Sequence, residues 1–130
     1  MEGNGYHGKA HDGSGGIMAW QWCHYAVWHQ DRVNLLLHMA SVPLFVAGLL
    51  AAARQAFFGE WFGASIAALL ALLAIGVQSL GHLREVARAP AAGNVYDSAR
   101  RALVENFITF PRFVLSGGWL HQMVSQPRPH

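Results

Sequence analysis

The sequence has 130 residues, of which 53% are hydrophobic and only 12% are charged. This length suits one domain, and the scarcity of charge excludes a disordered chain and argues against an ordinary soluble domain. The net charge is +2 and the nine Lys and Arg form no stripe, so nucleic acid is not an expected partner. A single cysteine, Cys23, excludes an internal disulfide and a multi-cysteine zinc site. The eight histidines are the polar residues whose arrangement needs an explanation.

The two ends of the chain differ from its middle. Residues 1–16 are glycine-rich and polar, without the apolar segment of a cleaved signal peptide, and we predict a disordered tail there. A second disordered tail is predicted at 125–130, which leaves 17–124 as a single helical membrane domain. Its first part, 17–30, is crowded with tryptophan and tyrosine, whose rings favour the water–lipid interface, so we expect an interfacial helix.

Two long segments, 33–53 and 61–83, contain no Asp, Glu, Lys or Arg and are apolar on every side. At ~1.5 Å per residue each is long enough to cross a hydrocarbon core of ~30 Å. The seven residues between them allow only a tight helical hairpin. Small residues recur every four positions from Gly63 to Ala71, a spacing that lets membrane helices approach closely.

The third apolar stretch, 102–124, is less regular because it contains Glu105, Pro111 and Arg112. It either spans the membrane with these groups facing inward or lies partly in the interface. The expected fold is therefore an all-α integral membrane protein. It consists of a helical hairpin, an interfacial N-terminal helix and a third membrane-associated helix, in a bundle of three to four helices.

The arginines are distributed unevenly about the hairpin. Five lie at the end where the first span begins and the second ends, and Arg54 lies at the other end; the five are Arg32, Arg84, Arg88, Arg100 and Arg101. The positive-inside rule places the arginine-rich end in the cytoplasm.

The hairpin also brings polar residues to that same end. His29 precedes the first span, His38 lies about one turn inside it, and His82 lies at the exit of the second span. Glu105 enters from the start of the third stretch. Asn34 and His38, four residues apart, share a helix face. His29 can join them only if the helix begins after it, and we predict Asp31 as the N-cap of that helix.

Three neutral imidazoles near a carboxylate form a borderline ligand set that suits iron, zinc or copper. Each residue also has a simpler interpretation. His38 alone is typical of an interhelical hydrogen bond, His82 of a helix C-terminus beside its dipole, and Glu105 of an ion pair with Arg112. Their common location favours a shared metal site.

The spacing of these residues resembles a known family. The pattern His29-x4-Asn34-x3-His38, followed by Pro43-Leu44, resembles the first motif of the membrane-bound 2-hydroxy fatty acid dioxygenases. These proteins serve fatty-acid alpha-oxidation and have many short bacterial relatives. Gln78-x2-Gly81-His82, with Pro90 eight residues later, is similar to the second motif. The resemblance covers roughly residues 25–90.

The resemblance implies an Fe(II)-dependent dioxygenase that shortens a 2-hydroxy fatty acid by one carbon. It implies a bacterial inner membrane and a lipid or fatty-acid substrate in the bilayer, and the positive-inside rule directs the metal-site end to the cytoplasm. His29, His38 and His82 would be metal ligands, with Asn34 and Gln78 as supporting residues. Glu105 is added as a supporting residue because it lies at the same end of the hairpin. The substrate carboxylate would be held at the surface by arginine, whose guanidinium matches its geometry; the candidates are Arg32, Arg84 and Arg88.

The chain departs from the family pattern at one position. The family commonly has a glutamate four residues after the second-motif histidine, where this chain has Val86. Glu85 stands one place earlier, and on a continuing helix it points ~100° away.

Two other functions are also compatible with the sequence. His38 and His82 would suit the axial positions of a small haem protein, which leaves His29 and Asn34 without a role. Alternatively, the chain is a non-catalytic small subunit of a larger membrane complex, with the aromatic 17–30 segment as its docking face. A homo-oligomer is compatible with either.

Overall fold

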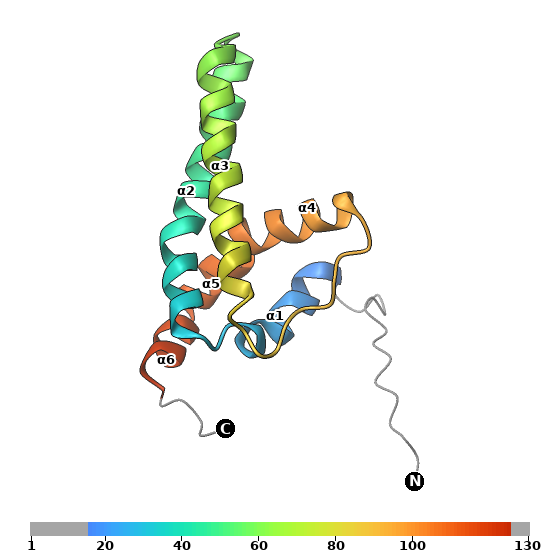
Figure 1. Ribbon diagram of the computed structural model, residues 1–130, viewed down its shortest axis with the longest axis vertical. Helices are drawn as coiled ribbons and strands as arrows, with labels where there is room; N and C mark the ends of the chain where they lie inside the picture. Colours follow the sequence, from blue (N-terminus) through green and yellow to red (C-terminus); the bar gives the residue numbers. More distant parts are fainter. Residues whose placement is uncertain (1–15, 126–130) are drawn as a thin grey trace.

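The computed structural model describes residues 16–125, which form helices joined by turns. Two long antiparallel helices rise from a wider base built by the shorter ones (Figure 1). In chain order the elements are α1 (Gly16–Trp28), α2 (Arg32–Phe57), α3 (Trp61–His82), α4 (Val95–Val104), the π-helical turn η1 (Glu105–Thr109), α5 (Phe110–Leu115) and α6 (Gly118–Val124). The all-helical expectation is confirmed for this part of the chain. The predicted tails lie outside the described residues except at their inner ends, where Gly16 already belongs to α1.

The hairpin of α2 and α3 matches the two apolar segments closely. Asp31 is the N-cap of α2, as predicted, and its side chain accepts a 2.9 Å hydrogen bond from the backbone N–H of Asn34. The helix continues through Pro43. The connection to α3 is a tight turn in which Gly59 has a φ of 75°, a conformation that glycine adopts without strain.

Small residues bring α2 and α3 into close contact. A Cβ atom added at Gly48 would lie 3.0 Å from the carbonyl oxygen of Ala67 and 3.2 Å from the backbone nitrogen of Ala71. The buried face of α3 is a row of alanines, whereas leucines of both helices are exposed on the outside; these leucines include Leu44, Leu50, Leu69, Leu72 and Leu80. An apolar exterior over a small-residue interface is typical of helices that pack in lipid.

Both helices are long and apolar enough to cross a membrane, with a mean hydropathy of 2.1 over an 18-residue window of α2 and 2.0 over one of α3. This is compatible with an integral membrane protein. The side of the membrane that the base faces stays a prediction from the arginine distribution.

The third apolar stretch is not a single straight helix. It is divided by η1 and by a turn at Gly117, where φ is 82°, so α5 and α6 are short. Arg112 lies over the ring of Trp22, with its guanidinium carbon 3.9 Å from the ring centroid. The expectation that Arg112 pairs with Glu105 is therefore wrong, because the carboxylate of Glu105 faces histidines instead.

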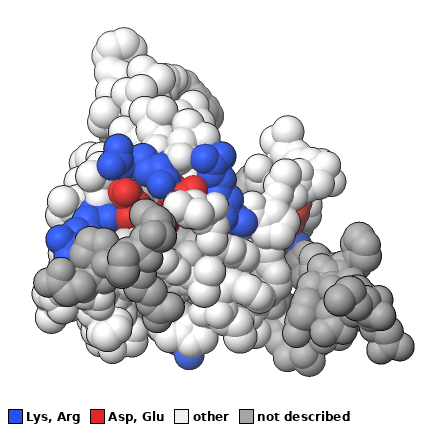
Figure 2. Space-filling view, turned by 60° about the horizontal axis from the view of Figure 1, so that its bottom comes forward, with Lys and Arg blue, Asp and Glu red and all other residues white. Residues whose placement is uncertain are grey.

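The base of the molecule packs the short helices around the beginning of α2. Its core combines α1, α2 and α5; the buried residues are Tyr25, Leu35, Val42, Phe110 and Phe113. α6 joins through Trp119, whose indole N–H donates to the carbonyl of Leu35 at 3.0 Å. Figure 2 shows basic and acidic side chains gathered on the face of the base, while the visible part of the protruding hairpin is uncharged.

Candidate metal centre

Four side chains from four segments meet where the hairpin enters the base. His29 comes from the connection between α1 and α2, His38 from α2, His82 from the last position of α3 and Glu105 from the first position of η1. One carboxylate oxygen of Glu105, Oε1, lies 3.1 Å from Nε2 of His38, 3.3 Å from Nε2 of His29 and 3.6 Å from Nε2 of His82. The four potential ligand atoms all lie within 4.8 Å of one another, so the group could hold a metal ion.

Backbone carbonyls fix the orientation of two of these imidazoles. Nδ1 of His29 lies 2.8 Å from the carbonyl oxygen of Tyr25, and Nδ1 of His38 lies 3.0 Å from that of Asn34. A carbonyl oxygen can only accept, so Nδ1 must carry the proton in each ring. In the neutral imidazole, Nε2 then presents its lone pair to the centre of the cluster. Metal-binding histidines in proteins are commonly held in this way.

The protonation states of His29 and Glu105 suit a bound metal ion. Burial lowers the pKa of His29, which favours the neutral imidazole. Burial by itself raises the pKa of Glu105, but hydrogen bonds from Nε2 of His29, His38 and His82, when these atoms carry a proton, outweigh burial and hold the pKa well below its ordinary value. His29 therefore offers a neutral nitrogen, and Glu105 an ionised oxygen, as metal ligands.

One atom of the cluster lacks a hydrogen-bond partner. Nε2 of His29 is buried and makes no hydrogen bond, although Glu105 lies beside it. When the imidazoles are neutral, lone pairs of nitrogen face a carboxylate and the groups repel one another. A cation at the centre would satisfy all four acceptors at once, and the residues therefore fit a bound metal.

Tyr25 completes the surroundings of Glu105. Its hydroxyl donates to Oε1 of Glu105 at 3.0 Å, and its ring stacks on His29 with centroids 3.8 Å apart. Burial, with the nearby carboxylate, raises the pKa of Tyr25 well above its ordinary value, so the phenol stays protonated and can donate. This contact of Tyr25 was not predicted from the sequence. Its position four residues before His29, on the same helical face, is the signal that could have indicated one.

The π-helical turn positions Glu105. Asn106, the next residue, is fully buried and exchanges hydrogen bonds with Gln78 of α3 at 2.7 and 3.2 Å. Thr109, at the end of the turn, donates to Gln21 of α1 at 2.7 Å. Single π turns inside helices are common at functional sites. Gln78, predicted as a supporting residue, thus supports the element that carries Glu105.

Asn34 and Glu85 hold the segment that carries His29. The Glu85 carboxylate accepts hydrogen bonds from the side chain of Asn34 at 2.8 Å and from the backbone N–H groups of Gln30 and Asp31 at 3.0 Å each. We expected Glu85 to point away on a continuing helix, and this is wrong. Because α3 ends at His82, the following turn directs Glu85 inward, while Val86 is 89% exposed.

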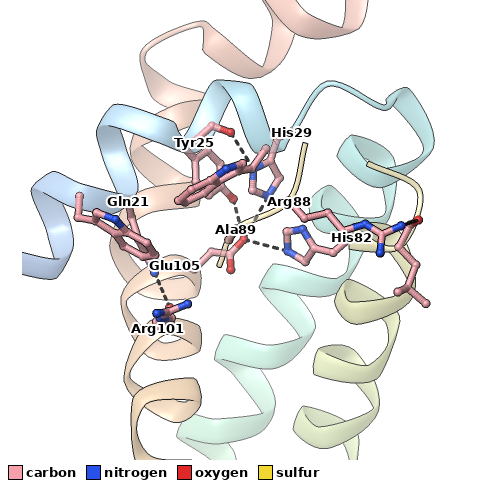
Figure 3. A pocket seen from close by; sticks show the side chains of 11 residues that line it. Gln21, Tyr25, His29, His82, Arg88, Ala89, Arg101 and Glu105 are labelled. Atoms are coloured by element: carbon pink, nitrogen blue, oxygen red, sulfur yellow. Dashed lines mark hydrogen bonds and ion pairs between the residues drawn. The ribbon is translucent and has the colours of Figure 1, made fainter. Parts of the chain in front are cut away.

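A cavity of about 230 Å³ opens beside the cluster (Figure 3). It lies between α1, the segment after α3 and the end of α4. Its walls are formed by Trp20, Gln21, Tyr25, Trp28, His29, His82, Leu83, Arg88, Ala89, Arg101 and Glu105. In Figure 3, His29, His82 and Glu105 point toward one another at one side of this space. The site is therefore reachable by a small molecule or by the end of a longer one.

The three arginines predicted to hold a carboxylate lie in different places. The guanidinium of Arg32 donates to the carbonyl of Ser125 at 2.8 Å, and that of Arg84 pairs with Asp31 at 3.0 Å. Neither lines the cavity. Arg88 does, but its guanidinium donates to the carbonyls of Leu83 and Glu85. Arg101, which was not among the predicted carboxylate-binding residues, also lines the cavity.

No family model, curated protein or solved structure matches this chain.

Proposed function

We propose that this chain is an Fe(II)-dependent membrane dioxygenase that shortens 2-hydroxy fatty acids by one carbon. The observation that carries the proposal is the convergence of three imidazole nitrogens and one carboxylate at the end of an apolar hairpin. The resemblance of the two histidine motifs to the 2-hydroxy fatty acid dioxygenases adds the reaction class.

The ligand set supports iron among the metals that it suits. His29, His38 and His82 would supply nitrogen and Glu105 oxygen, a mixture that binds iron, zinc or copper. Bound there, ferrous iron would supply the oxygen-activating redox chemistry that protein side chains lack. The overall reaction balances without another reductant, because a 2-hydroxy acid and O2 give the shortened acid, CO2 and water.

The residues around the cluster have separate tasks in this proposal. Tyr25 donates to Glu105 and holds the carboxylate in place. Trp20 and Trp28 line the cavity with apolar surface, which limits the access of water to the reacting end of the substrate. The substrate's acyl chain can remain in the bilayer beside the exposed leucines of the hairpin.

The geometry disfavours the haem interpretation. A porphyrin must fit between its two axial ligands, but the rings of His38 and His82 contact each other with centroids 4.7 Å apart. Glu105 also lies within 3.6 Å of both Nε2 atoms. A haem would have to displace this carboxylate and separate the two helices.

Metal analysis with an absorption spectrum tests the proposal on anaerobically purified protein in detergent. We expect about one iron per chain, no Soret band, and oxygen uptake with 2-hydroxyhexadecanoic acid but not with hexadecanoic acid. A Soret band would assign the histidines to haem. Failure to bind iron after ferrous reconstitution would overturn the enzyme proposal and favour a subunit of a membrane complex.

A further inference from the structure

The cavity beside the cluster contains an arginine with an unused, buried N–H group. Arg101 lines the cavity, and its side chain is only 17% exposed. One terminal nitrogen of its guanidinium donates to the carbonyl of Pro90 at 2.6 Å, and the other pairs with Asp97 at 3.1 Å. The third nitrogen, Nε, is buried without a hydrogen-bond partner.

An unpartnered buried N–H group of a charged side chain is costly, because it has lost its water and gained no acceptor. The remaining contact of the guanidinium does not supply one. Its central carbon lies over the ring of Trp20, 4.7 Å from the centroid. This stacking fixes the plane of the guanidinium, but it gives the Nε–H group no acceptor oxygen.

Arg101 and the metal centre border the same cavity. Arg101 precedes Glu105 by four residues on the same continuous helical run, so their side chains share one side of that run. Both line the same cavity, together with the apolar surfaces of Trp28 and Leu83. An anion at Arg101 would lie beside the cluster, with apolar walls for an attached acyl chain.

We propose that Arg101 determines specificity by binding the substrate carboxylate through Nε, in place of Arg32, Arg84 and Arg88. The substrate then enters between α1 and the segment after α3, with the part of its acyl chain nearest the carboxylate against Trp20, Trp28 and Leu83. This inference rests on the proposed function for the identity of the substrate, whereas the anion site itself depends only on the residues described.

Equilibrium binding of two ligands tests the inference, with and without iron. The ligands are 2-hydroxyhexadecanoate and hexadecane-1,2-diol, which differ in the carboxylate. Binding is followed by tryptophan fluorescence, since Trp20 and Trp28 line the cavity, after subtraction of ligand partition into empty micelles. We expect Arg101→Gln to weaken acid binding by about 10- to 100-fold, the range for a charge-assisted hydrogen bond, and to change diol binding less than about twofold.

Arg100→Gln is the matched control. Arg100 is the neighbouring residue and pairs with the same carboxylate, Asp97, at 3.2 Å, but it does not line the cavity. Its substitution should leave the affinity for both ligands unchanged. If Arg101→Gln does not fold, binding to the wild-type protein still tests the inference. Equal affinity of the wild type for the acid and the diol would overturn it.

The two proposals can fail separately. Acid binding that depends on Arg101 in a protein that takes up no iron would support the anion site and overturn the dioxygenase. Iron binding and turnover of the acid, with unchanged acid affinity in Arg101→Gln, would overturn the role of Arg101 and leave the dioxygenase standing.

Discussion

The two halves of the hairpin are built in different ways. In the half near the turn at Gly59, α2 and α3 meet through small residues, and Gly48 lies against Ala67 and Ala71. In the half near the base, the helices bury polar side chains. All the buried polar residues of α2 and α3 lie in this half, namely Asn34, His38, Ser41 and Gln78.

This difference separates what holds the fold from what builds the site. Close packing of small residues is sufficient to join two apolar helices and requires no polar group. Buried polar groups cost free energy unless they find partners, and an ionisable group within a membrane helix is usually functional. Nδ1 of His38 donates to the carbonyl of Asn34, which offsets part of this cost, and Nε2 faces the carboxylate of Glu105, where a cation would offset the rest. Substitutions in the two halves should therefore have different consequences.

The largest effect is expected from substitution of the cluster itself. His38→Ala and His82→Ala should each abolish stoichiometric iron binding, because each removes one of three nitrogen ligands. The helical content should change little, since the half near the turn holds the hairpin. Metal analysis and far-UV circular dichroism measure the two properties.

His121→Ala is the control for these variants, because His121 is exposed on α6 and takes no part in the cluster. Its iron content should equal that of the wild type. Equal iron content in all three variants would contradict the proposed site.

A smaller loss of metal binding is expected from substitution of Glu85. Glu85→Gln weakens the acceptor of three hydrogen bonds that hold the segment carrying His29. Loss of such outer partners typically lowers metal affinity by about 10- to 100-fold. Competition with a chelator measures the affinity. Glu60→Gln, at the exposed turn of the hairpin, should leave it unchanged, and equal affinity in both variants would limit Glu85 to a structural role.

In the half near the turn at Gly59, a substitution should lower the stability of the fold and leave iron binding unchanged. Gly48→Leu places a side chain where a Cβ already lies 3.0 Å from the carbonyl of Ala67, so the helices must separate. We expect a loss of about 1–3 kcal/mol in the free energy of unfolding, with one iron still bound per chain. Gly76→Leu is the control, because nothing lies within 4 Å of a Cβ there. Denaturation in mixed micelles measures the stability, and a loss of iron in Gly48→Leu would show that the two halves are coupled.

The sequence predicted those parts of the molecule that depend on local patterns. The length of the two apolar segments predicted the hairpin. Because His29 and His38 would lie on opposite faces of one straight helix, the helix was predicted to start after His29, and Asp31 is indeed its N-cap. The role of Glu85 was missed because it depends on where α3 ends. Arg101 was missed as a cavity residue because its contacts with Trp20 and Pro90 join segments that are distant in sequence. Likewise, the π turn at Glu105 depends on the buried pair of Asn106 and Gln78 and has no local signature.

The four members of the cluster are unequally shielded, and this has a kinetic consequence. The side chains of His29 and His38 are 2% and 0% exposed, whereas that of His82 is 37% exposed and borders the cavity. An incoming ion can therefore meet His82 first and shed its water stepwise as the inner ligands replace it. A bound ion would leave in the reverse order, so the rate at which a water-soluble chelator removes it would depend on access through the His82 side.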